Sequence, residues 1–380
     1  MVRVLLDATV DSTDGIGRYT RWVAGGLSRA APPDIDVVVR PASVARRYSR
    51  AAGRELLSRA TDAHADLVHL LDYRVPVTAA PELATIVTVH DVLRVLYPDL
   101  CYSDADFAAR SGEEGLADLR DVVADLREVA AFPAGRSLAS AHEEYLGRML
   151  ALAVTRAERV ITPTATVASA LCGVTPAKDK VFVSSWGVDH LPAASGAAPP
   201  GVPDRYVLYV GQARQHKGLP ALLAAVTLAA PRHGGLALML AGRDFTPAGP
   251  AARSAAHAVG DHRVVALGEV SDAVLAQLYT GATALVHLAD HEGFGFPPLE
   301  ALAHGCPVLA ADIPVLRETL GPHAVFADRH DPEDVITRLE ELIAVDGPVP
   351  RAERVAWAHR FQWSRHVDDL LACYRQLGSR

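Results

Sequence analysis

The stretch Tyr206-Val-Leu-Tyr-Val-Gly-Gln-Ala-Arg-Gln-His-Lys-Gly-Leu-Pro220 decides the fold. Its first five residues form a short apolar run that ends at a glycine, which predicts a buried strand. A polar loop follows over residues 211–218, and a helical pattern begins near Leu219. The loop carries Arg214 and Lys217, which can reach a shared anion, the arginine as a planar fork and the lysine as a point charge. A basic loop that merely faces solvent is the alternative.

The same strand–loop–helix unit recurs along the chain. Short apolar runs bounded by turn residues alternate with longer helical patterns, which is typical of βαβ units on a parallel sheet. Strands are predicted at 2–6, 37–40, 67–70, 86–90, 159–162 and 181–184, and in a second series at 206–210, 237–241, 264–267, 284–287 and 307–310. The fold class is therefore α/β, with two Rossmann-like, doubly wound domains. Such domains bind ligands at the carboxyl ends of their strands, so a cleft between the two is expected to hold the ligand.

A Pro/Gly/Ala stretch without periodicity separates the two series. It predicts a linker at residues 193–203, between a first domain at 1–192 and a second at 204–360. The last segment, 361–380, has apolar residues at helical spacing and predicts a helix that packs one face onto a domain.

Composition excludes several classes of protein. The chain has 380 residues and a formal net charge of −8, which argues against a general nucleic-acid binder or a binder of anionic membranes. Its four cysteines are scattered, which is typical of a reduced, intracellular protein. The sequence runs from Met1 directly into a strand pattern, and no segment has about 18 uninterrupted apolar residues. A soluble cytoplasmic protein without a transmembrane segment is expected; peripheral membrane contact is left open.

A second motif, His-Glu-Gly-Phe-Gly-Phe-Pro-Pro-Leu-Glu, occupies residues 291–300. Its glycines let backbone amides approach a bulky ligand, and Pro297 or Pro298 fits the first position of a helix. A turn that opens a helix offers unpaired amides and a positive dipole end, which suit an anion such as phosphate. The alternative is that Glu300 only complements the helix dipole.

The first domain offers weaker signals. Gly15 and Gly17 lie between the first strand and the next helix and resemble half of a dinucleotide fingerprint, but Thr20 stands at the third glycine position. They predict either a loop that a diphosphate or acceptor can approach, or a turn that simply needs glycine. His90 and Asp91 end a predicted strand, where a histidine can bind substrate hydroxyls or assist proton movement. A structural histidine is the alternative.

Residues 103–131 form an acidic excursion, with eight acidic residues against three arginines at otherwise helical spacing. The simpler interpretation is a solvated amphipathic helix. The sharper hypothesis is an acidic cover that favours a cationic acceptor. No metal site is predicted, because His287 and His291, although four apart, fall on a strand and a loop and cannot share one helical face.

Taken in order, these motifs make the chain resemble the glycosyltransferases of the GT-B architecture, specifically the retaining, nucleotide-sugar-dependent enzymes of glycosyltransferase family four. The resemblance is carried by Asp-Gly-Ile-Gly-Arg-Tyr at 14–19, Val-His-Asp at 89–91, Ser-Trp-Gly-Val-Asp at 185–189, Val-Gly-(x)5-Lys-Gly at 210–218, and the segment 292–308 that begins with the Glu-Gly-Phe-Gly-Phe motif. The chain departs from the family pattern at Gln212, where many relatives have arginine, and at Leu288-Ala289, where many have Pro-Ser.

The resemblance implies which residues bind the donor and the acceptor. In the second domain, Arg214 and Lys217 would hold the diphosphate of the donor and Glu300 its ribose. The neighbouring positions implied in donor binding are Gly293, Phe294, Gly295, Phe296 and Val270, the last beside the base. Glu292 would face the transferred sugar. From the first domain, Gly17 would approach the donor, while Gly15, His90 and Asp91 would lie on the acceptor side, and the last helix would cross back onto this domain.

The expected function is therefore transfer of a hexosyl group from a donor of GDP-mannose or UDP-hexose type to a hydroxyl, with His90, Glu292, Arg214 and Lys217 as the catalytic set. The acceptor would be a polysaccharide, a glycolipid or a small metabolite, including an aminocyclitol antibiotic. No cofactor and no metal are expected, because Arg214 and Lys217 would stabilise the leaving diphosphate. The alternatives are a nucleotide-sugar epimerase on the same architecture and a non-catalytic sugar-nucleotide-binding protein; a nicotinamide oxidoreductase is disfavoured by the incomplete glycine fingerprint.

Overall fold

A computed structural model of the protein shows two compact units. Unit 1 comprises Met1–Trp186 and Trp363–Arg380, and unit 2 comprises Gly187–Gln362. The structure describes residues 1–10, 14–40, 43, 45–78, 83–131, 138–195, 201–260, 263–344 and 347–378. Residues 11–13 of the predicted glycine loop and 196–200 of the predicted linker lie outside this description.

Unit 1 is built on six parallel strands in the order β2-β1-β3-β4-β5-β6. Its strands are β1 (Val2–Asp7), β2 (Ile35–Arg40), β3 (Leu67–Leu70), β4 (Ala84–Thr88), β5 (Arg159–Thr162) and β6 (Val181–Val183). Helices cover a parallel sheet on both faces, so its central strands are apolar throughout rather than alternating. β3 is buried at all four positions.

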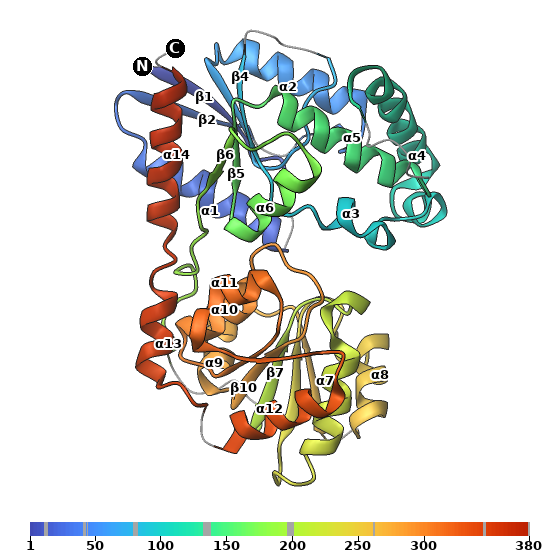
Figure 1. The fold of residues 1–380 in the computed structure, drawn as a ribbon, viewed down its shortest axis with the longest axis vertical. Coiled ribbons are helices and arrows are strands. Elements are labelled where there is room, and N and C mark those ends of the chain that lie inside the picture. Colours follow the sequence, from blue (N-terminus) through green and yellow to red (C-terminus); the bar gives the residue numbers. More distant parts are fainter. Residues whose placement is uncertain are drawn as a thin grey trace. The chain divides into compact units, whose positions relative to one another are not determined.

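The helices of unit 1 begin at residues that can cap them. Asp14, Ser49, Ser103 and Ser140 each accept hydrogen bonds from first-turn amides of the helix that follows. The helices are α1 (Gly15–Ala30), α2 (Arg50–Asp62), α3 (Leu93–Leu96), α4 (Asp104–Val129), α5 (Ala141–Arg156), α6 (Ala165–Val174) and α14 (Trp363–Gly378), with a 3-10 turn at Pro98–Leu100. Gly112, at φ 78°, interrupts α4, and Figure 1 shows α4 packed beside α5.

The last helix, α14, completes unit 1 through buried polar contacts. Figure 1 shows α14 alongside the sheet, where it contacts α1 and β1. His366 on α14 lies 3.1 Å from the Tyr19 hydroxyl and 2.7 Å from Ser184 Oγ. Tyr374 on the same helix lies 2.7 Å from Nδ1 of His69 on β3. Both histidines are fully buried, so these bonds satisfy groups that would otherwise destabilise the core.

These two histidines should make unit 1 sensitive to acid. Burial lowers the pKa of His69 and of His366 to about 3, whereas the unfolded chain titrates near pH 6.5. Below about pH 6.5 the unfolded state binds more protons, so the free energy of unfolding should fall as the pH falls toward 3. The slope should approach about 1.4 kcal/mol per pH unit for each histidine.

Urea unfolding between about pH 6.5 and 5 measures this slope, because carboxyl groups titrate mostly below that range. The His366→Gln variant should lose only the share of the slope that one buried histidine contributes, about 1.4 kcal/mol per pH unit at most, because burial also lowers the pKa of His90 and of His142. A free energy of unfolding that stays constant over this range would contradict the prediction.

Unit 2 has a second six-stranded parallel sheet, in the order β12-β11-β10-β7-β8-β9. Its strands are β7 (Tyr206–Val210), β8 (Ala237–Ala241), β9 (Val264–Gly268), β10 (Ala284–His287), β11 (Val308–Ala311) and β12 (Val325–Ala327). The first strand of the series, β7, lies in the middle, and the strand order reverses between β7 and β10. This reversal is the position where doubly wound sheets bind ligands.

Seven helices of unit 2 connect these strands or follow them among the described residues. They are α7 (Leu219–Ala229), α8 (Pro250–Val259), α9 (Asp272–Gly281), α10 (Phe296–Ala303), α11 (Pro314–Leu320), α12 (Pro332–Ala344) and α13 (Arg351–Ala358), with 3-10 turns at Gln215–Lys217 and Gly321–His323. α7 packs against α8 and α12, and α10 packs against α13 (Figure 1). The predicted α/β class with two Rossmann-like units is confirmed.

Some predicted boundaries were wrong. β4 ends at Thr88, so His90 and Asp91 follow the strand instead of ending it. Gly15 and Gly17 lie in the first turn of α1 and not in a loop before it. The helix after the 291–300 motif begins one residue before Pro297. β12 was not predicted; it is a three-residue strand at the edge of its sheet, and two of its residues are partly exposed.

The chain passes between the units at two places, after Trp186 and after Gln362. The first of these places lies six residues before the predicted boundary at 192. Val188 lies at the beginning of unit 2 and Phe361 at its end. The amide of Val188 donates to the carbonyl of Phe361 at 3.0 Å, so a hydrogen bond joins the two ends of unit 2. Among the described residues, no helix is both long enough and apolar enough to cross a membrane.

Candidate functional site

Two loops meet at the strand reversal of unit 2. One follows β7 and spans residues 211–218, and the other follows β10 and spans residues 288–295. β7 and β10 are neighbours, so both loops leave the sheet at the same edge. The amide of Asp290 donates to the carbonyl of His216 at 2.8 Å, which ties one loop to the other. The two sequence motifs therefore form one site.

Close packing of the two loops requires a glycine at position 218. Gly218 has φ +73°, and a Cβ atom placed there would lie 2.0 Å from the carbonyl oxygen of Leu288. Any other residue would combine backbone strain with a direct collision. The glycine that ends the Lys-Gly motif thus serves the contact between the loops, and this contact fixes the position of Lys217 beside the second loop.

The centre of the site is an ion pair between Lys217 and Glu292. Lys217 Nζ lies 2.6 Å from Glu292 Oε1, and His287 Nε2 lies 2.8 Å from the same oxygen. Burial raises the pKa of Glu292, but Lys217 and His287 outweigh burial, and the net effect holds this pKa well below its ordinary value. Glu292 is therefore an ionised carboxylate at neutral pH, held in one orientation by two donors.

Arg214 adds positive charge to the same loop. It is half-buried and has no ion pair among the residues that the structure describes. Burial, together with Lys217 and then Arg214, lowers the pKa of His216 to about 4. Lys217 and Arg214 thus both act on His216 electrostatically, although burial is the larger cause of its lowered pKa, and two cations on one loop suit an anionic group such as a diphosphate.

The start of α10 borders this ion pair. Gly295 is the N-cap of α10 at φ +86°, and a Cβ atom there would lie 2.7 Å from Leu316 Cδ2. Phe294 and Phe296 are buried and their ring centroids lie 5.1 Å apart. These rings anchor the backbone of residues 293–296 next to Glu292. The structure therefore places Gly293, Phe294, Gly295 and Phe296 beside the ion pair, and their role in donor binding stays a prediction.

Glu300 lies behind the site, on α10. Its side chain has no exposed surface; Oε1 lies 2.9 Å from His190 Nε2, and Oε2 accepts from the Tyr279 hydroxyl at 2.9 Å. The predicted contact with a ribose stays a prediction. Neither His190 nor Tyr279 was identified from the sequence, and His287 was considered only as a metal ligand.

Val270 lies farther from the ion pair of Lys217 and Glu292 in the strand order of the sheet. It follows β9, the edge strand, which β8 separates from β7. Backbone hydrogen bonds connect these strand ends, from Gly211 to Ala241 and from Gly242 to Gly268. The role of Val270 beside a base stays a prediction.

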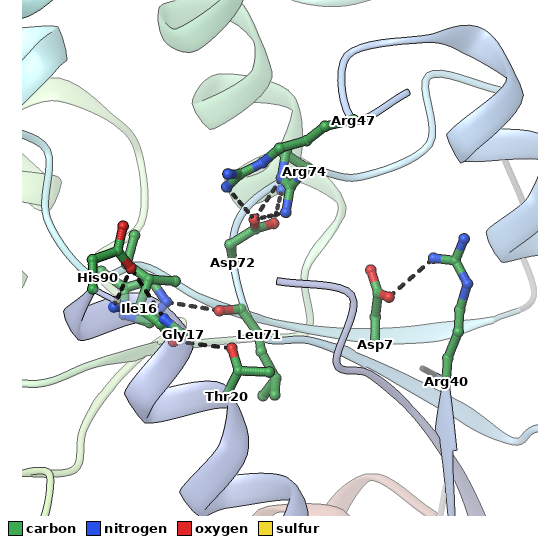
Figure 2. A network of polar contacts seen from close by, with 11 residues as sticks. Asp7, Ile16, Gly17, Thr20, Arg40, Arg47, Leu71, Asp72, Arg74 and His90 are labelled. Atoms are coloured by element: carbon green, nitrogen blue, oxygen red, sulfur yellow. Dashed lines mark hydrogen bonds and ion pairs between the residues drawn. The ribbon is translucent and has the colours of Figure 1, made fainter. Parts of the chain in front are cut away.

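The predicted acceptor-side residues belong to unit 1. His90 Nε2 lies 2.7 Å from the Leu71 carbonyl, and since a carbonyl only accepts, this nitrogen carries the hydrogen (Figure 2). Burial lowers the pKa of His90, so the ring is neutral at pH 7. Its Nδ1 is buried and has no hydrogen-bond partner among the described residues. A neutral His90 can therefore accept a hydrogen bond from a hydroxyl at Nδ1.

The other candidates of unit 1 surround His90 in part. The ring centroids of Tyr19, on α1, and of His90 lie 4.9 Å apart, which places His90 beside the first turns of α1. Gly15 and Gly17 lie in this first turn, and Gly17 donates its amide to Asp14. Asp91 instead accepts the amide of Leu93 at 3.0 Å, and no contact between its carboxylate and His90 is observed among the described residues.

Arginines form ion pairs with five of the eight acidic residues of the excursion. Arg46 pairs with Glu114 and Asp118 of α4, and Arg50 pairs with Asp121 and Asp125. Two further ion pairs join Arg120 to Asp104 and Arg127 to Glu144. The apolar side of α4 is buried in the core through Leu116, Leu119, Val122, Val123 and Leu126. Part of the acidic face thus forms ion pairs that join α4 to residues at the start of α2, which weakens the argument for an acidic cover; the cationic acceptor stays a hypothesis.

No group of three or more His, Cys, Asp or Glu side chains is arranged to hold a metal ion within the described part of the chain. The expectation of a metal-free reaction stays a prediction.

Comparison with known proteins identifies unit 2. The family model described as "Glycosyl transferases group 1" matches residues 197–358, which include both loops of the site. These residues are a group 1 glycosyl transferase domain. The family resemblance drawn from the motifs is therefore confirmed, and its residues Lys217, Glu292 and Glu300 all lie within the group 1 domain.

Relatives share parts of the chain. The serotype-specific mannosyltransferase WbdA of Escherichia coli is 35% identical over 107 residues, which are 28% of this chain and 13% of that protein. A D-inositol 3-phosphate glycosyltransferase of Actinosynnema mirum is 30% identical over 247 residues, which are 59% of this chain and 58% of that protein. The chain therefore spans less than two thirds of the length of either relative.

The fold extends beyond the group 1 domain to the whole chain. The structure of sucrose-phosphate synthase from Thermosynechococcus elongatus matches with a TM-score of 0.72 and 18% identity, and the match covers 100% of both chains. The GT-B fold class predicted from the sequence is confirmed.

Proposed function

We propose that the chain is a retaining hexosyltransferase that moves a hexosyl group from a nucleoside diphosphate sugar to a hydroxyl of an acceptor. The observation that carries this proposal is the pairing of Lys217 with an ionised Glu292, beside Arg214, at the strand reversal of a group 1 domain. The donor is of GDP-mannose or UDP-hexose type, and unit 2 binds it. Unit 1 binds the acceptor, and the cytoplasmic location inferred from the sequence is part of the proposal.

Each charged group has a separate role in this reaction. The bond between the sugar C1 and the phosphate oxygen breaks, and a bond from C1 to the acceptor oxygen forms on the same face of the sugar. The acceptor proton passes to the leaving phosphate. Lys217 and Arg214 stabilise the negative charge that grows on this phosphate. Glu292 orients sugar hydroxyls and stabilises positive charge at C1, while His90 accepts a hydrogen bond from a substrate hydroxyl.

The relatives support a range of acceptors. The names of the two proteins above indicate a mannosyl donor for one and an inositol phosphate acceptor for the other. For this chain we propose a hydroxyl on a polysaccharide, a glycolipid or a small metabolite. An amine-bearing metabolite remains one member of this set, although the paired acids of α4 no longer favour it.

Thermal unfolding against a panel of nucleotides and nucleotide sugars tests the donor. UDP, GDP and ADP, each with its hexose derivatives, are compared with and without a chelator. A specific ligand at about 100 times its Kd should stabilise the folded protein by about 2.7 kcal/mol and raise the unfolding temperature. The stabilisation should persist in the chelator.

Two outcomes would contradict the proposal. If no nucleoside diphosphate shifts the unfolding temperature, unit 2 does not bind the donor. If the donor is converted into a stereoisomer without any acceptor present, the reaction is that of an epimerase.

A further inference from the structure

Unit 1 contains a cavity of about 320 Å³ at the carboxyl edge of its sheet. Asp7 and Arg40, the last residues of β1 and β2, line it together with residues 74–78, which follow β3. The strand order of this sheet reverses between β1 and β3, because β2 lies on the other side of β1. The cavity therefore occupies the ligand-binding position of a doubly wound sheet, and its volume is that of a small-molecule site.

Arginines dominate the charged lining. Two aspartates, Asp7 and Asp125, line the cavity, against the five arginines Arg40, Arg47, Arg50, Arg54 and Arg74. The first turn of α2 lines the cavity through Arg50 and two further residues, Ala52 and Gly53, so the positive end of that helix dipole faces the same space.

The acidic groups nearby do not satisfy all of these arginines. Asp72 is shared by Arg74 and Arg47, the second at 3.5 Å (Figure 2). Arg50 is paired with α4 as described above. Arg54 is exposed at the cavity and has no ion pair among the described residues.

Of the five arginines, Arg40 gives the strongest evidence for a bound anion. Its side chain is 4% exposed; Nη1 donates to Asp7 at 2.9 Å, and Nη2 lies 3.4 Å from Glu55. Its Nε is buried and has no hydrogen-bond partner within the described residues. Burial raises the pKa of Asp7 despite the neighbouring Arg40. A buried guanidinium with unused donors points to an acceptor that is supplied by a ligand.

The cavity is connected with His90 through the end of β3. Leu71 accepts the hydrogen bond from His90, and the next residue, Asp72, holds Arg47 and Arg74 at the cavity (Figure 2). His90 and two of the arginines therefore contact adjacent residues, Leu71 and Asp72, of the segment that follows β3.

We propose that this cavity binds an anionic group, a phosphate or a carboxylate, carried by the acceptor. The inference rests on the proposed function for the statement that the ligand is the acceptor, but the anion site itself does not depend on it. The acceptor proposed here is anionic, whereas the acidic excursion suggested a cationic acceptor. Arg54 and Arg47 bind the anion at the exposed side of the cavity, and Arg40 and Arg74 bind it from the buried side.

Calorimetric titration of the full chain with inorganic phosphate, and separately with acetate, tests the site. The double variant Arg47→Gln/Arg54→Gln removes two largely exposed arginines and leaves the buried Arg40 and Arg74 in place, so it should fold. Its affinity for the preferred anion should fall about 100-fold, since each charge-assisted hydrogen bond typically contributes about tenfold or more. Arg59→Gln changes an exposed arginine of the same helix outside the cavity and should bind like the wild type.

The variant Lys217→Met separates this site from the donor site of unit 2. Anion binding that persists in Lys217→Met and disappears in the arginine variant supports the proposal, whether or not nucleotides bind to unit 2. Tighter binding of phosphate than of acetate assigns the group as a phosphate, and the reverse order assigns a carboxylate. The proposal is overturned if the arginine variant and the wild type have equal anion affinity. It is also overturned if only Lys217→Met loses anion binding.

Discussion

Replacing Lys217 by methionine should lower kcat by about 100- to 1,000-fold at saturating donor. Methionine keeps much of the apolar stem but removes the charge that lies 2.6 Å from Glu292. Without this charge, the negative charge that grows on the leaving phosphate loses one of the two cations, Arg214 and Lys217, that the loop after β7 supplies. The loss should appear in kcat because the charge develops in the transition state and is not fully present in the bound donor. Steady-state kinetics with the donor found in the nucleotide panel measures it.

Two controls separate this effect from a change in structure. Lys178→Met removes an exposed lysine of unit 1 and should leave kcat unchanged. Glu292→Gln keeps Lys217 while removing its carboxylate partner, so it reports the contribution of the other half of the pair. If Lys217→Met turns over at the wild-type rate, the lysine does not act on the leaving group.

Replacing Glu300 by alanine should destabilise unit 2 by about 3 kcal/mol or more. The carboxylate is fully buried, and its loss removes the acceptor of two buried hydrogen bonds, from His190 and from the Tyr279 hydroxyl. The substitution also leaves a cavity beneath the start of α10, where few side chains can rearrange. Urea unfolding of the full chain, followed by fluorescence and by circular dichroism, measures the lower free energy of unfolding.

Milder variants distinguish the structural role of Glu300 from the proposed ribose contact. Tyr279→Phe removes only one of the two hydrogen bonds and should cost about 1 kcal/mol. Glu300→Gln preserves the shape of the side chain, so its nucleotide affinity can be measured on a folded protein. A Glu300→Ala protein as stable as the wild type would show that the two bonds contribute nothing. Unchanged nucleotide affinity in Glu300→Gln would exclude the ribose contact.

The strands were predictable because parallel sheets are buried on both faces. Runs such as Tyr206–Val210 and Ala237–Ala241 are apolar throughout, and their predicted and observed bounds agree. Errors arose where local composition does not mark the end of an element. The apolar pattern of β4 continues through Val89, yet sheet pairing stops at Thr88. Three-residue β12 gives too few positions for any periodicity.

The site was predictable from its motifs only in part. Lys217 and Glu292 were each identified within a glycine-rich loop, but their ion pair is a consequence of the pairing of β7 with β10. His190 could not be connected to Glu300 because 110 positions separate them in sequence. No local pattern reports such a contact.

The charge of the acidic excursion also depends on contacts between residues far apart in sequence. Its residues were read as an unbalanced face, because the nearest arginines in sequence are few. Arg46 and Arg50, which form ion pairs with four of these acids and offset two of their charges, lie 68 to 75 positions earlier in the chain. Tertiary structure, and not composition, decides whether an acidic segment presents a net charge to a ligand.

The chain connectivity imposes an order on folding during synthesis. Unit 2 is one continuous segment whose two ends are joined by the bond between Val188 and Phe361, so everything it needs has emerged once residue 362 leaves the ribosome. Unit 1 begins first but requires Tyr374 and His366 to satisfy His69 and Tyr19 in its interior. The strands of unit 1 are therefore translated before unit 2, but unit 1 is completed only after unit 2, when α14 can pack against its sheet.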